Sequence, residues 1–199
     1  MIGIIDYGAG NLHSVMNALN YLKIRHRLIK DFEDFTGINK IILPGVGAFG
    51  AAVQRLKSNG LYEAICDWIK SGRSYLGICL GLQLLFESSR EAKGIKGFGI
   101  LNGRIKKFRA YKIPQIGWNS VKILRSSPLI EVGEQDLFFY FLHSYYPVVS
   151  SNKLIIGVTE YGINYPSIIN QGNIYAVQFH PEKSGKTGLR LLKNWAGRC

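Results

Sequence analysis

The N-terminal part of the chain alternates between short apolar runs and segments with helical periodicity, and this alternation limits the fold more than any other feature. The predicted strands cover residues 2–5, 26–29, 40–43 and 74–76, while helical segments start at Leu12, cover residues 51–57 and 61–70, and start again at Leu80. Strands that alternate with helices in this way are joined by crossovers and lie parallel. The pattern predicts an α/β fold whose mostly parallel central sheet is flanked by helices.

The second half of the chain has a different pattern, in which short strand-like runs are separated by Gly, Pro and Asn. These runs cover residues 98–100, 104–108, 117–124, 137–142, 153–160, 167–170 and 174–178, and residues 188–195 return to helical periodicity. Such spacing is typical of antiparallel strands. No internal repeat, low-complexity tract or linker interrupts the chain. We therefore expect residues 1–199 to form one domain with additional antiparallel strands in its C-terminal half.

Composition and cysteine content narrow the class of protein. A hydrophobic fraction of 47% is ordinary for a globular chain, no apolar run is long enough to span a membrane, and the N-terminal residues lack the features of a signal peptide. Cys66, Cys79 and Cys199 have no metal-ligand spacing, and their odd number argues against a disulfide framework. We therefore expect a cytoplasmic protein without membrane association, metal or other cofactor.

The net charge of +12 is concentrated in part between Arg90 and Arg125, where Glu91 is the one acidic residue. We call this segment the basic belt; its ten basic residues are Arg90, Lys93, Lys96, Arg104, Lys106, Lys107, Arg109, Lys112, Lys122 and Arg125. Such a belt can bind nucleic acid, a phosphorylated ligand or an acidic protein, or it can be solvated surface. No recognised nucleic-acid module accompanies it, so we expect no nucleic-acid partner and favour an acidic protein.

A candidate nucleophile lies in the turn Gly77-Ile78-Cys79-Leu80-Gly81, between a predicted strand and a predicted helix. A G-x-C-x-G turn at this place is the cysteine version of the nucleophile elbow, in which glycines allow the sharp bend that presents the reactive side chain. The positive end of a helix dipole favours the thiolate. The alternative is that Cys79 is a small buried hydrophobic residue.

A candidate base follows the predicted strand 174–178, where His180 and Glu182 lie two residues apart around Pro181. An imidazole can help to form a thiolate and later protonate a leaving group, and a carboxylate on its other nitrogen fixes the tautomer. The alternative is a surface turn that happens to contain both residues. The elbow at Cys79 makes the catalytic interpretation the stronger one.

These motifs resemble the class I glutamine amidotransferases, whose glutaminase domains have a flavodoxin-like sheet and a Cys-His-Glu triad. The resemblance depends on G-I-C-L-G-L-Q at residues 77–83 and Q-F-H-P-E at residues 178–182. A finer resemblance is to the glutaminase subunits of imidazole glycerol phosphate synthases. It is carried by blocks that span nearly the whole chain in matching order: D-Y-G-A-G-N-L-H-S-V from Asp6, P-G-V-G-A-F-G from Pro44, I-G-W-N from Ile116, Y-F-L-H-S-Y-Y from Tyr140, Tyr161-Gly162, and Q-F-H-P-E-K-S from Gln178.

The resemblance implies that the chain hydrolyses L-glutamine to L-glutamate and ammonia. Cys79 would attack the side-chain amide, His180 would transfer protons, and Glu182 would orient His180. The backbone N–H of Leu80 would be one oxyanion donor, and Val46 or Gly47 would supply another. Because each such donor is typically worth ~10²–10³ in rate, a loop that swings to present its donor would switch the reaction on and off.

The resemblance also implies a glutamine site and a protein partner. Gln83, Ser144 and Tyr145 match glutamine-binding positions, and Glu91 is a candidate for binding the α-ammonium group. The family's partner is a cyclase with a (β/α)₈ barrel, which uses the ammonia in L-histidine biosynthesis. Together the two subunits form a lyase complex, a heterodimer. Positions near that interface and the ammonia passage correspond to Asn11, Tyr140 and Lys183.

Two segments depart from the family pattern. Gln115 and Ile116 replace the usual histidine and methionine before G-W-N, and residues 163–169 replace a more usual Phe-x-Ala-Ala-Val pattern. Neither departure touches the triad, but both leave the ammonia acceptor open. The alternative is a paralogous subunit that supplies ammonia to a sugar amidotransferase in surface-polysaccharide biosynthesis. A stand-alone cysteine hydrolase or peptidase, and a non-catalytic binding module, are weaker alternatives.

Overall fold

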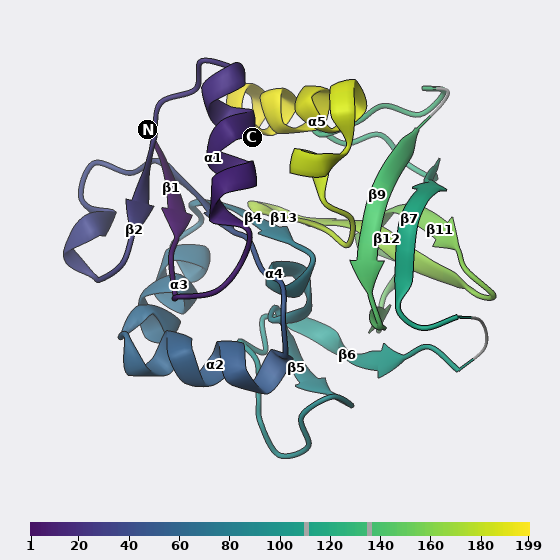
Figure 1. Ribbon diagram of the computed structural model, residues 1–199, viewed down its shortest axis with the longest axis horizontal. Helices are drawn as coiled ribbons and strands as arrows, with labels where there is room; N and C mark the ends of the chain where they lie inside the picture. Colours follow the sequence, from purple (N-terminus) through teal and green to yellow (C-terminus); the bar gives the residue numbers. More distant parts are fainter. Residues whose placement is uncertain (110–111, 135–136) are drawn as a thin grey trace.

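The computed structural model describes residues 1–109, 112–134 and 137–199, and its largest element is an eight-stranded sheet (Figure 1). The order of its strands is β2 (His26–Ile29), β1 (Ile2–Ile5), β3 (Lys40–Leu43), β4 (Ser74–Ile78), β13 (Ile174–Val177), β12 (Asn164–Gln171), β11 (Ile155–Glu160) and β8 (Lys122–Ile123). The first five are parallel to one another and the last three are antiparallel. The parallel strands have the flavodoxin-like order, which confirms the predicted mostly parallel sheet.

Helices cover both faces of the parallel strands (Figure 1). On one face α1 (Leu12–Tyr21) and α5 (Gly185–Arg198) bury residues such as Val15 and Trp195, and on the other α2 (Phe49–Ser58) and α3 (Leu61–Lys70) bury Leu56 and Trp68. Because neither face meets water, β1 and β13 are buried at every position. This is why their sequences are continuous apolar runs.

Two smaller sheets complete the fold. One contains β10 (Tyr145–Val149), β6 (Leu101–Lys107) and β5 (Phe86–Ser89), and the other pairs β7 (Gln115–Ser120) with β9 (Phe138–His143). Three single turns of 3₁₀ helix are η1 (Glu33–Phe35), η2 (Asn152–Leu154) and η3 (Pro181–Lys183). The pair β7–β9 is antiparallel and stands beside the C-terminal strands of the large sheet (Figure 1). The additional antiparallel strands are thus present in the C-terminal half, as predicted.

The helix predicted from Leu80 onward is wrong in its length. The element α4 (Leu80–Gln83) is one turn long. The Leu84 carbonyl accepts a hydrogen bond from the Phe98 N–H at 2.7 Å, and the Leu85 carbonyl accepts one from the Ile100 N–H at 2.9 Å. These carbonyls are therefore not available to a continuing helix, and the chain proceeds as β5.

Other predicted bounds also differ from the structure. Residues 98–100 form no strand, and Phe98 and Ile100 donate those hydrogen bonds to the segment just after α4. The run 117–124 is divided into β7 and β8 at Val121. The strands β5 and β10 were not predicted. In contrast, β1, β2, β3 and α3 have the predicted bounds.

The parallel arrangement brings four loops to one edge of the sheet. The segments that follow β1, β3, β4 and β13 all leave the carboxyl ends of adjacent parallel strands. Ligand sites in open α/β sheets form at this edge. Cys79 follows β4, and His180 lies three residues after β13, so the topology places both candidate catalytic residues at the same edge.

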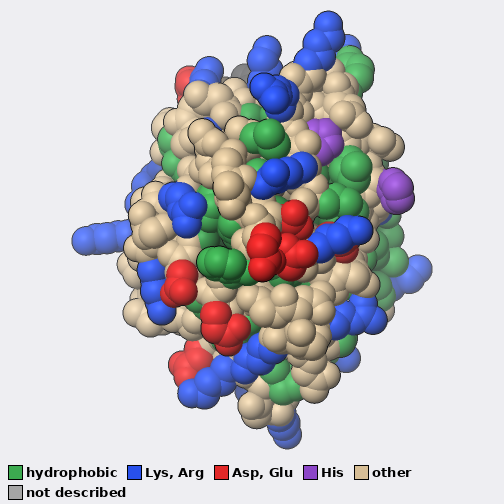
Figure 2. Space-filling view, turned by 90° about the vertical axis from the view of Figure 1, so that its left-hand side faces the viewer, with side chains coloured by type: hydrophobic (Ala, Val, Ile, Leu, Met, Phe, Trp, Pro, Cys, Tyr) green, Lys and Arg blue, Asp and Glu red, His purple; other side chains and the backbone are tan. Residues whose placement is uncertain are grey.

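Over the described ranges, no helix combines the length and the apolar character that a membrane crossing requires. Figure 2 shows the face beside β2, where Lys and Arg side chains are spread over the surface and carboxylates gather near the middle. The positive charge of the chain is thus not confined to the basic belt.

Candidate active site

Cys79 lies at a sharp turn between β4 and α4. Its φ of 53° is unusual for a residue with a side chain. A Cβ at Gly77 would lie 2.6 Å from the Gly81 carbonyl oxygen, and one at Gly81 would lie 2.0 Å from the Leu43 carbonyl oxygen. Only glycine fits at either position. The sequence G-x-C-x-G is therefore required by the close approach of three backbone segments, as expected for a nucleophile elbow.

The Cys79 side chain is 5% exposed, and two polar groups contact its sulfur. The Leu142 carbonyl oxygen lies 3.7 Å away, and the Gln178 side-chain nitrogen Nε2 lies 3.6 Å away. The contact with the carbonyl oxygen suits a thiol, whose S–H can donate a hydrogen bond. The contact with the amide nitrogen suits a thiolate, which accepts a hydrogen bond from N–H.

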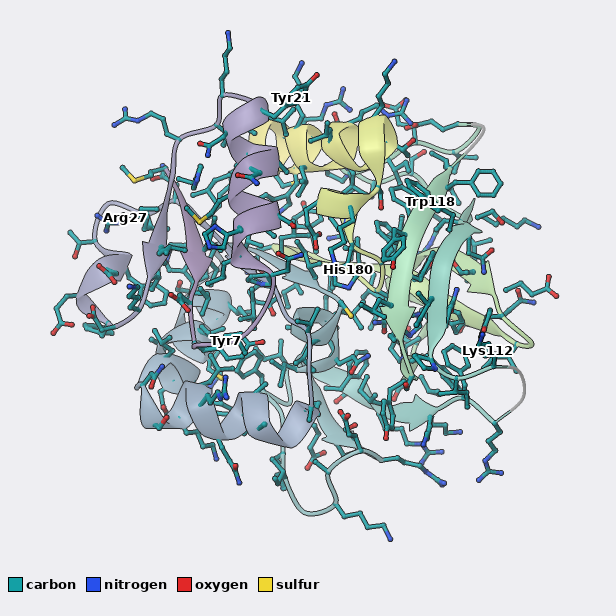
Figure 3. The ribbon with its side chains drawn as sticks, in the orientation of Figure 1. Tyr7, Tyr21, Arg27, Lys112, Trp118 and His180 are labelled. Atoms are coloured by element: carbon teal, nitrogen blue, oxygen red, sulfur yellow. The ribbon has the colours of Figure 1, made fainter. Side chains whose placement is uncertain are left out.

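His180 and Glu182 form a buried pair. His180 Nδ1 lies 2.8 Å from Glu182 Oε1, and both side chains are 2% exposed. The His180 N–H donates to the Tyr140 carbonyl at 2.8 Å, and the Ser184 hydroxyl donates to the His180 carbonyl at 2.6 Å. These bonds fix the turn between β13 and α5 against β9. His180 lies in the interior between the parallel strands and β9 (Figure 3).

The charge state of His180 depends on its neighbours. Burial lowers the pKa of the imidazole, but the Cys79 sulfur and the Glu182 carboxylate together outweigh burial and raise it to about 10. The Nε2 atom is buried and makes no hydrogen bond within the described residues. An imidazolium with a free Nε2 beside a sulfur can stabilise a thiolate and deliver a proton to a leaving group.

A cavity of about 250 Å³ opens beside the sulfur. It brings together seven of the residues predicted for substrate or oxyanion binding, which are Val46, Gly47, Leu80, Gln83, Glu91, Ser144 and Tyr145. Cys79 lies in its wall, while His180 and Glu182 lie behind the sulfur and do not line it. One oxygen of Glu91 accepts a hydrogen bond from the Phe49 N–H at 2.8 Å, so this carboxylate also fixes the start of α2.

The predicted oxyanion donor Leu80 is engaged in this structure. Its N–H donates to the Gly45 carbonyl at 3.4 Å. A Cβ at Gly45 would lie 2.7 Å from the Leu80 Cβ, so the loop after β3 packs directly on the turn after Cys79. An oxyanion could bind at the Leu80 N–H only after the Gly45 carbonyl had turned away.

Two of the three residues predicted to lie near a partner are neighbours in the structure. The Lys183 ammonium lies 5.9 Å from the centre of the Tyr140 ring, and both side chains are half-buried. The Asn11 side chain accepts a hydrogen bond from the Ser14 N–H at 3.4 Å and caps α1. The structure thus brings Tyr140 and Lys183 together and gives Asn11 a local role at the start of a helix.

A second cavity, of about 850 Å³, is larger but lies away from the sulfur. It lies against β5 and β6, and six belt residues line it: Arg90, Lys93, Lys96, Arg104, Lys107 and Arg109. Neither Cys79 nor His180 reaches it. Size alone would therefore select the wrong cavity, and the reactive groups identify the smaller one.

The hydrogen bonds that join His143, which lines the cavity, to Tyr165 and Gln115 were not predicted. His143 Nδ1 donates to the Tyr145 carbonyl at 2.7 Å, and the Tyr165 hydroxyl lies between His143 Nε2 (3.2 Å) and the Gln115 side-chain amide (2.9 Å). Burial lowers the pKa of His143 to about 4. Gln115 and Tyr165 come from the two segments that depart from the family pattern. Because the two segments are about fifty residues apart, no local signal could have paired them.

Comparison with known families identifies the chain. Residues 3–198 match the family described as glutamine amidotransferase class-I. The chain is 48% identical to the imidazole glycerol phosphate synthase subunit HisH of Methanocaldococcus jannaschii, over 98% of each chain. It is also 48% identical to the same subunit of Prochlorococcus marinus, over 98% of this chain and 96% of that one, and 43% identical to that of Bacillus cereus, over 99% and 94%.

Solved structures support the fold. A crystal structure of a glutamine amidotransferase superposes with a TM-score of 0.74 at 18% identity, covering 98% of this chain and 96% of that one. The structure of PurLQS from Thermotoga maritima superposes with a TM-score of 0.74 at 17% identity, covering 97% and 95%. These likenesses extend over nearly the whole chain.

Proposed function

This chain belongs to the class I glutamine amidotransferase family, and from that premise we propose that it is the glutaminase subunit of imidazole glycerol phosphate synthase. In this role it hydrolyses glutamine and supplies ammonia for histidine biosynthesis. The alternative, a subunit for a sugar amidotransferase, is not favoured, because relatives that are 43–48% identical over their whole length have the synthase name. We further propose that the chain acts as one domain in the cytoplasm.

One observation carries the catalytic proposal. The sulfur of Cys79 and the imidazole of His180 come from strands about a hundred residues apart, yet they are buried next to each other, with Glu182 behind the imidazole and a small cavity in front of the sulfur. In this proposal Cys79 is the nucleophile, His180 is the acid and base, and Glu182 orients His180 and stabilises its charged form.

The first half of the reaction releases ammonia. The Cys79 thiolate attacks the side-chain carbonyl carbon of glutamine, and the carbonyl oxygen becomes an oxyanion. His180 then gives its Nε2 proton to the nitrogen, and the C–N bond breaks. Ammonia leaves and a thioester remains on Cys79. The buried Nδ1–Oε1 contact with Glu182 keeps the acidic proton on Nε2, the nitrogen that faces the sulfur.

The second half regenerates the enzyme. Neutral His180 takes a proton from a water molecule, and the resulting hydroxide attacks the thioester. The C–S bond breaks, glutamate leaves, and the thiolate–imidazolium pair forms again. The rise in the pKa of His180 to about 10 favours this charged pair at neutral pH.

The cavity suits a single amino acid. At about 250 Å³ it is smaller than the sites of drug-sized ligands, and its wall has a carboxylate at Glu91 and polar groups at Gln83 and Ser144. We assign Glu91 to the substrate α-ammonium group, and Gln83, Ser144 and Tyr145 to the remainder of glutamine. After the Gly45 carbonyl turns away, Leu80 together with Val46 or Gly47 would supply the oxyanion donors.

An apolar surface next to the active site supports a protein partner. In the register of β7 and β9, Trp118 lies opposite Tyr140, and Ser120 lies opposite Phe138. Ile116, Trp118 and Phe138 therefore share one face, and they are 60%, 58% and 50% exposed. We call this the outer face of β7–β9, and Figure 3 shows Trp118 there. A contiguous exposed apolar face is typical of an interface.

This outer face is close to the reaction. The Tyr140 carbonyl accepts the His180 N–H, and Leu142 of the same strand contacts the Cys79 sulfur. We propose that a cyclase subunit with a (β/α)₈ barrel covers this face, with Asn11, Tyr140 and Lys183 near the interface. Ammonia released at Cys79 would then enter the partner without meeting bulk water, where most of it would be protonated.

Replacing the nucleophile tests the function. In the complex with the cyclase, Cys79→Ala should abolish glutamine-dependent synthesis but leave synthesis from added ammonium intact. Cys199→Ala is the matched control, because it removes a thiol far from the site, and it should keep both activities. Residual glutaminase activity above about 1% in the Cys79→Ala complex would end the triad assignment. Failure to recover a cyclase with the tagged chain would end the partner assignment.

A further inference from the structure

The side chain of Gln178 is a polar group on the nucleophile that the triad does not account for. It is fully buried, and its Nε2 lies 3.6 Å from the Cys79 sulfur. The Leu142 carbonyl oxygen also contacts this sulfur, at 3.7 Å. A carbonyl oxygen next to a sulfur favours the protonated thiol, because it repels a thiolate. An N–H donor has the opposite effect.

The orientation of Gln178 is fixed by its own hydrogen bonds. Its side-chain oxygen accepts a hydrogen bond from Gln83 Nε2 at 3.3 Å, and its backbone N–H donates to the Ser167 carbonyl at 2.9 Å. Since the oxygen of the amide is bound to Gln83, its NH₂ group must face the sulfur. A donor at this position is therefore built into the site.

Gln83 is held in turn. Its Nε2 also donates to the Tyr145 carbonyl at 3.0 Å, and it is 4% exposed. The same carbonyl accepts the His143 Nδ1–H at 2.7 Å, and Tyr165 contacts the other nitrogen of His143. These side chains, of which Gln83 and His143 line the cavity, thus form one connected series that ends at the sulfur. A substitution at one end of this series can therefore affect the nucleophile, because each side chain is oriented by its neighbour.

We propose that Gln178 is a further catalytic residue, whose N–H stabilises the Cys79 thiolate, and that Gln83 is the positioning residue that turns this N–H toward the sulfur. The inference deepens the proposed glutaminase function and depends on it. It also gives Gln83 a second role besides lining the glutamine cavity.

The neighbouring titratable groups do not replace this donor. The groups within electrostatic reach of the sulfur are His180 and the phenols of Tyr7 and Tyr165. Burial raises the pKa of both phenols above the usual value, so they are neutral near pH 7. His180 supplies the positive charge, and Gln178 supplies a neutral N–H that needs no proton transfer.

The test is the pH dependence of the alkylation of Cys79 by iodoacetamide in the full-length chain, followed by mass spectrometry of the Cys79 peptide. Removing the donor in Gln178→Leu should move the midpoint of this profile to higher pH by about one unit, since a tenfold change in an equilibrium is a typical value for one hydrogen bond to a charged group. Gln178→Glu, which places a carboxylate against the sulfur, should move it further in the same direction.

The same variants should separate catalysis from binding. In the complex with the cyclase, Gln178→Leu should lower the kcat for glutamine about tenfold and change KM less than about twofold. Gln83→Met should move the alkylation midpoint by less than Gln178→Leu does, because the donor stays but loses its orientation. Asn194→Leu is the matched control: it removes a side-chain amide that donates to the Leu129 carbonyl at 3.0 Å, outside this series, and should leave the midpoint unchanged.

An unchanged midpoint in folded Gln178→Leu would overturn the inference. If Gln178→Leu does not fold, as judged by circular dichroism, Gln178→Glu becomes the deciding variant. An alkylation midpoint of Gln178→Glu that is unchanged or lower would exclude a contact between this side chain and the sulfur. These outcomes are independent of the function itself. Glutaminase activity of Cys79→Ala would reject the proposed function, whereas the alkylation profiles require only that Cys79 be reactive.

Discussion

The carboxyl edge of the parallel strands and the outer face of β7–β9 lie next to each other but are built in opposite ways. At the edge, Cys79, His180 and Glu182 are buried, and Gly81 approaches a backbone carbonyl so closely that no other residue fits. On the outer face, Trp118 and its apolar neighbours are half or more exposed, although Phe139 and Phe141 on the opposite face of β9 are buried.

The proposed function accounts for the difference. A thiolate and an imidazolium are strong reagents only where water is excluded and their geometry is fixed. A surface that is to be covered by a second protein must instead stay open until that protein arrives. Changes at the edge should therefore affect chemistry and stability, and changes on the outer face should affect assembly alone.

The largest expected effect is at the edge. Glu182→Gln keeps the shape of the side chain but removes the charge that helps to raise the pKa of His180. We expect kcat of the complex to fall by about 10³-fold or more, with the fold retained. Steady-state kinetics with glutamine, and circular dichroism of the variant, measure the two quantities. A loss of less than tenfold would mean that the carboxylate does not orient the imidazole.

Gly81→Ala tests how closely the edge is packed. The new Cβ would lie 2.0 Å from the Leu43 carbonyl oxygen, and neither backbone segment can move freely because both are buried. We expect a loss of more than about 3 kcal/mol in the free energy of unfolding, or no folded protein. Gly197→Ala in α5 is the control, because a Cβ there meets nothing within 4 Å. Equal stability of the two variants in urea denaturation would contradict the packing argument.

Trp118→Ala tests the outer face. A large aromatic side chain at the centre of an interface typically contributes about 2 kcal/mol, so the Kd for the proposed cyclase partner should rise about thirtyfold. The free energy of unfolding of the chain alone should stay the same within about 0.5 kcal/mol. Leu124→Ala, which shortens a side chain that is 47% exposed elsewhere, should leave the Kd unchanged. Calorimetric titration measures the affinity, and a Trp118→Ala chain that binds normally would move the interface elsewhere.

The smallest effect concerns His143, which connects the two regions from the buried face of β9. Its pKa falls from 6.5 to about 4 on folding because burial disfavours the charged form. Between these pH values the unfolded chain binds a proton that the folded chain does not, so stability falls as the pH falls. From pH 7 to pH 5 the loss should be roughly 1.5 to 2 kcal/mol greater than in His143→Gln. Urea denaturation of both proteins at pH 7 and pH 5 measures this difference. An equal loss of stability in the unsubstituted chain and in His143→Gln would contradict the lowered pKa of His143.

Much of the parallel half could be predicted from local patterns. The strands β1, β2 and β3 and the helix α3 have the predicted bounds. A strand that is buried on both faces has a continuous apolar sequence, and a helix that is buried on one face has apolar residues at helical spacing. Cys79, His180 and Glu182 could be found because their chemistry requires those residue types beside glycine or proline. The structure places them together, and their roles stay predictions.

The remainder could not be predicted because it depends on distant partners. The end of α4 is set by hydrogen bonds from Phe98 and Ile100, and the start of α2 by the Glu91 carboxylate. In the sequence Gln178 is only one letter of the Q-F-H-P-E motif. Its contact with the sulfur depends on a hydrogen bond from Gln83, about a hundred residues earlier in the chain. Contacts of this kind have no periodicity that a sequence could display.

The hydrogen bond from the Leu80 N–H to the Gly45 carbonyl has a consequence for the cell. If the proposed partner is what turns the Gly45 carbonyl away, a chain that has not yet assembled should leave the glutamine pool untouched. Surplus copies would then be idle rather than wasteful, and the two subunits need not be synthesised in strictly equal amounts.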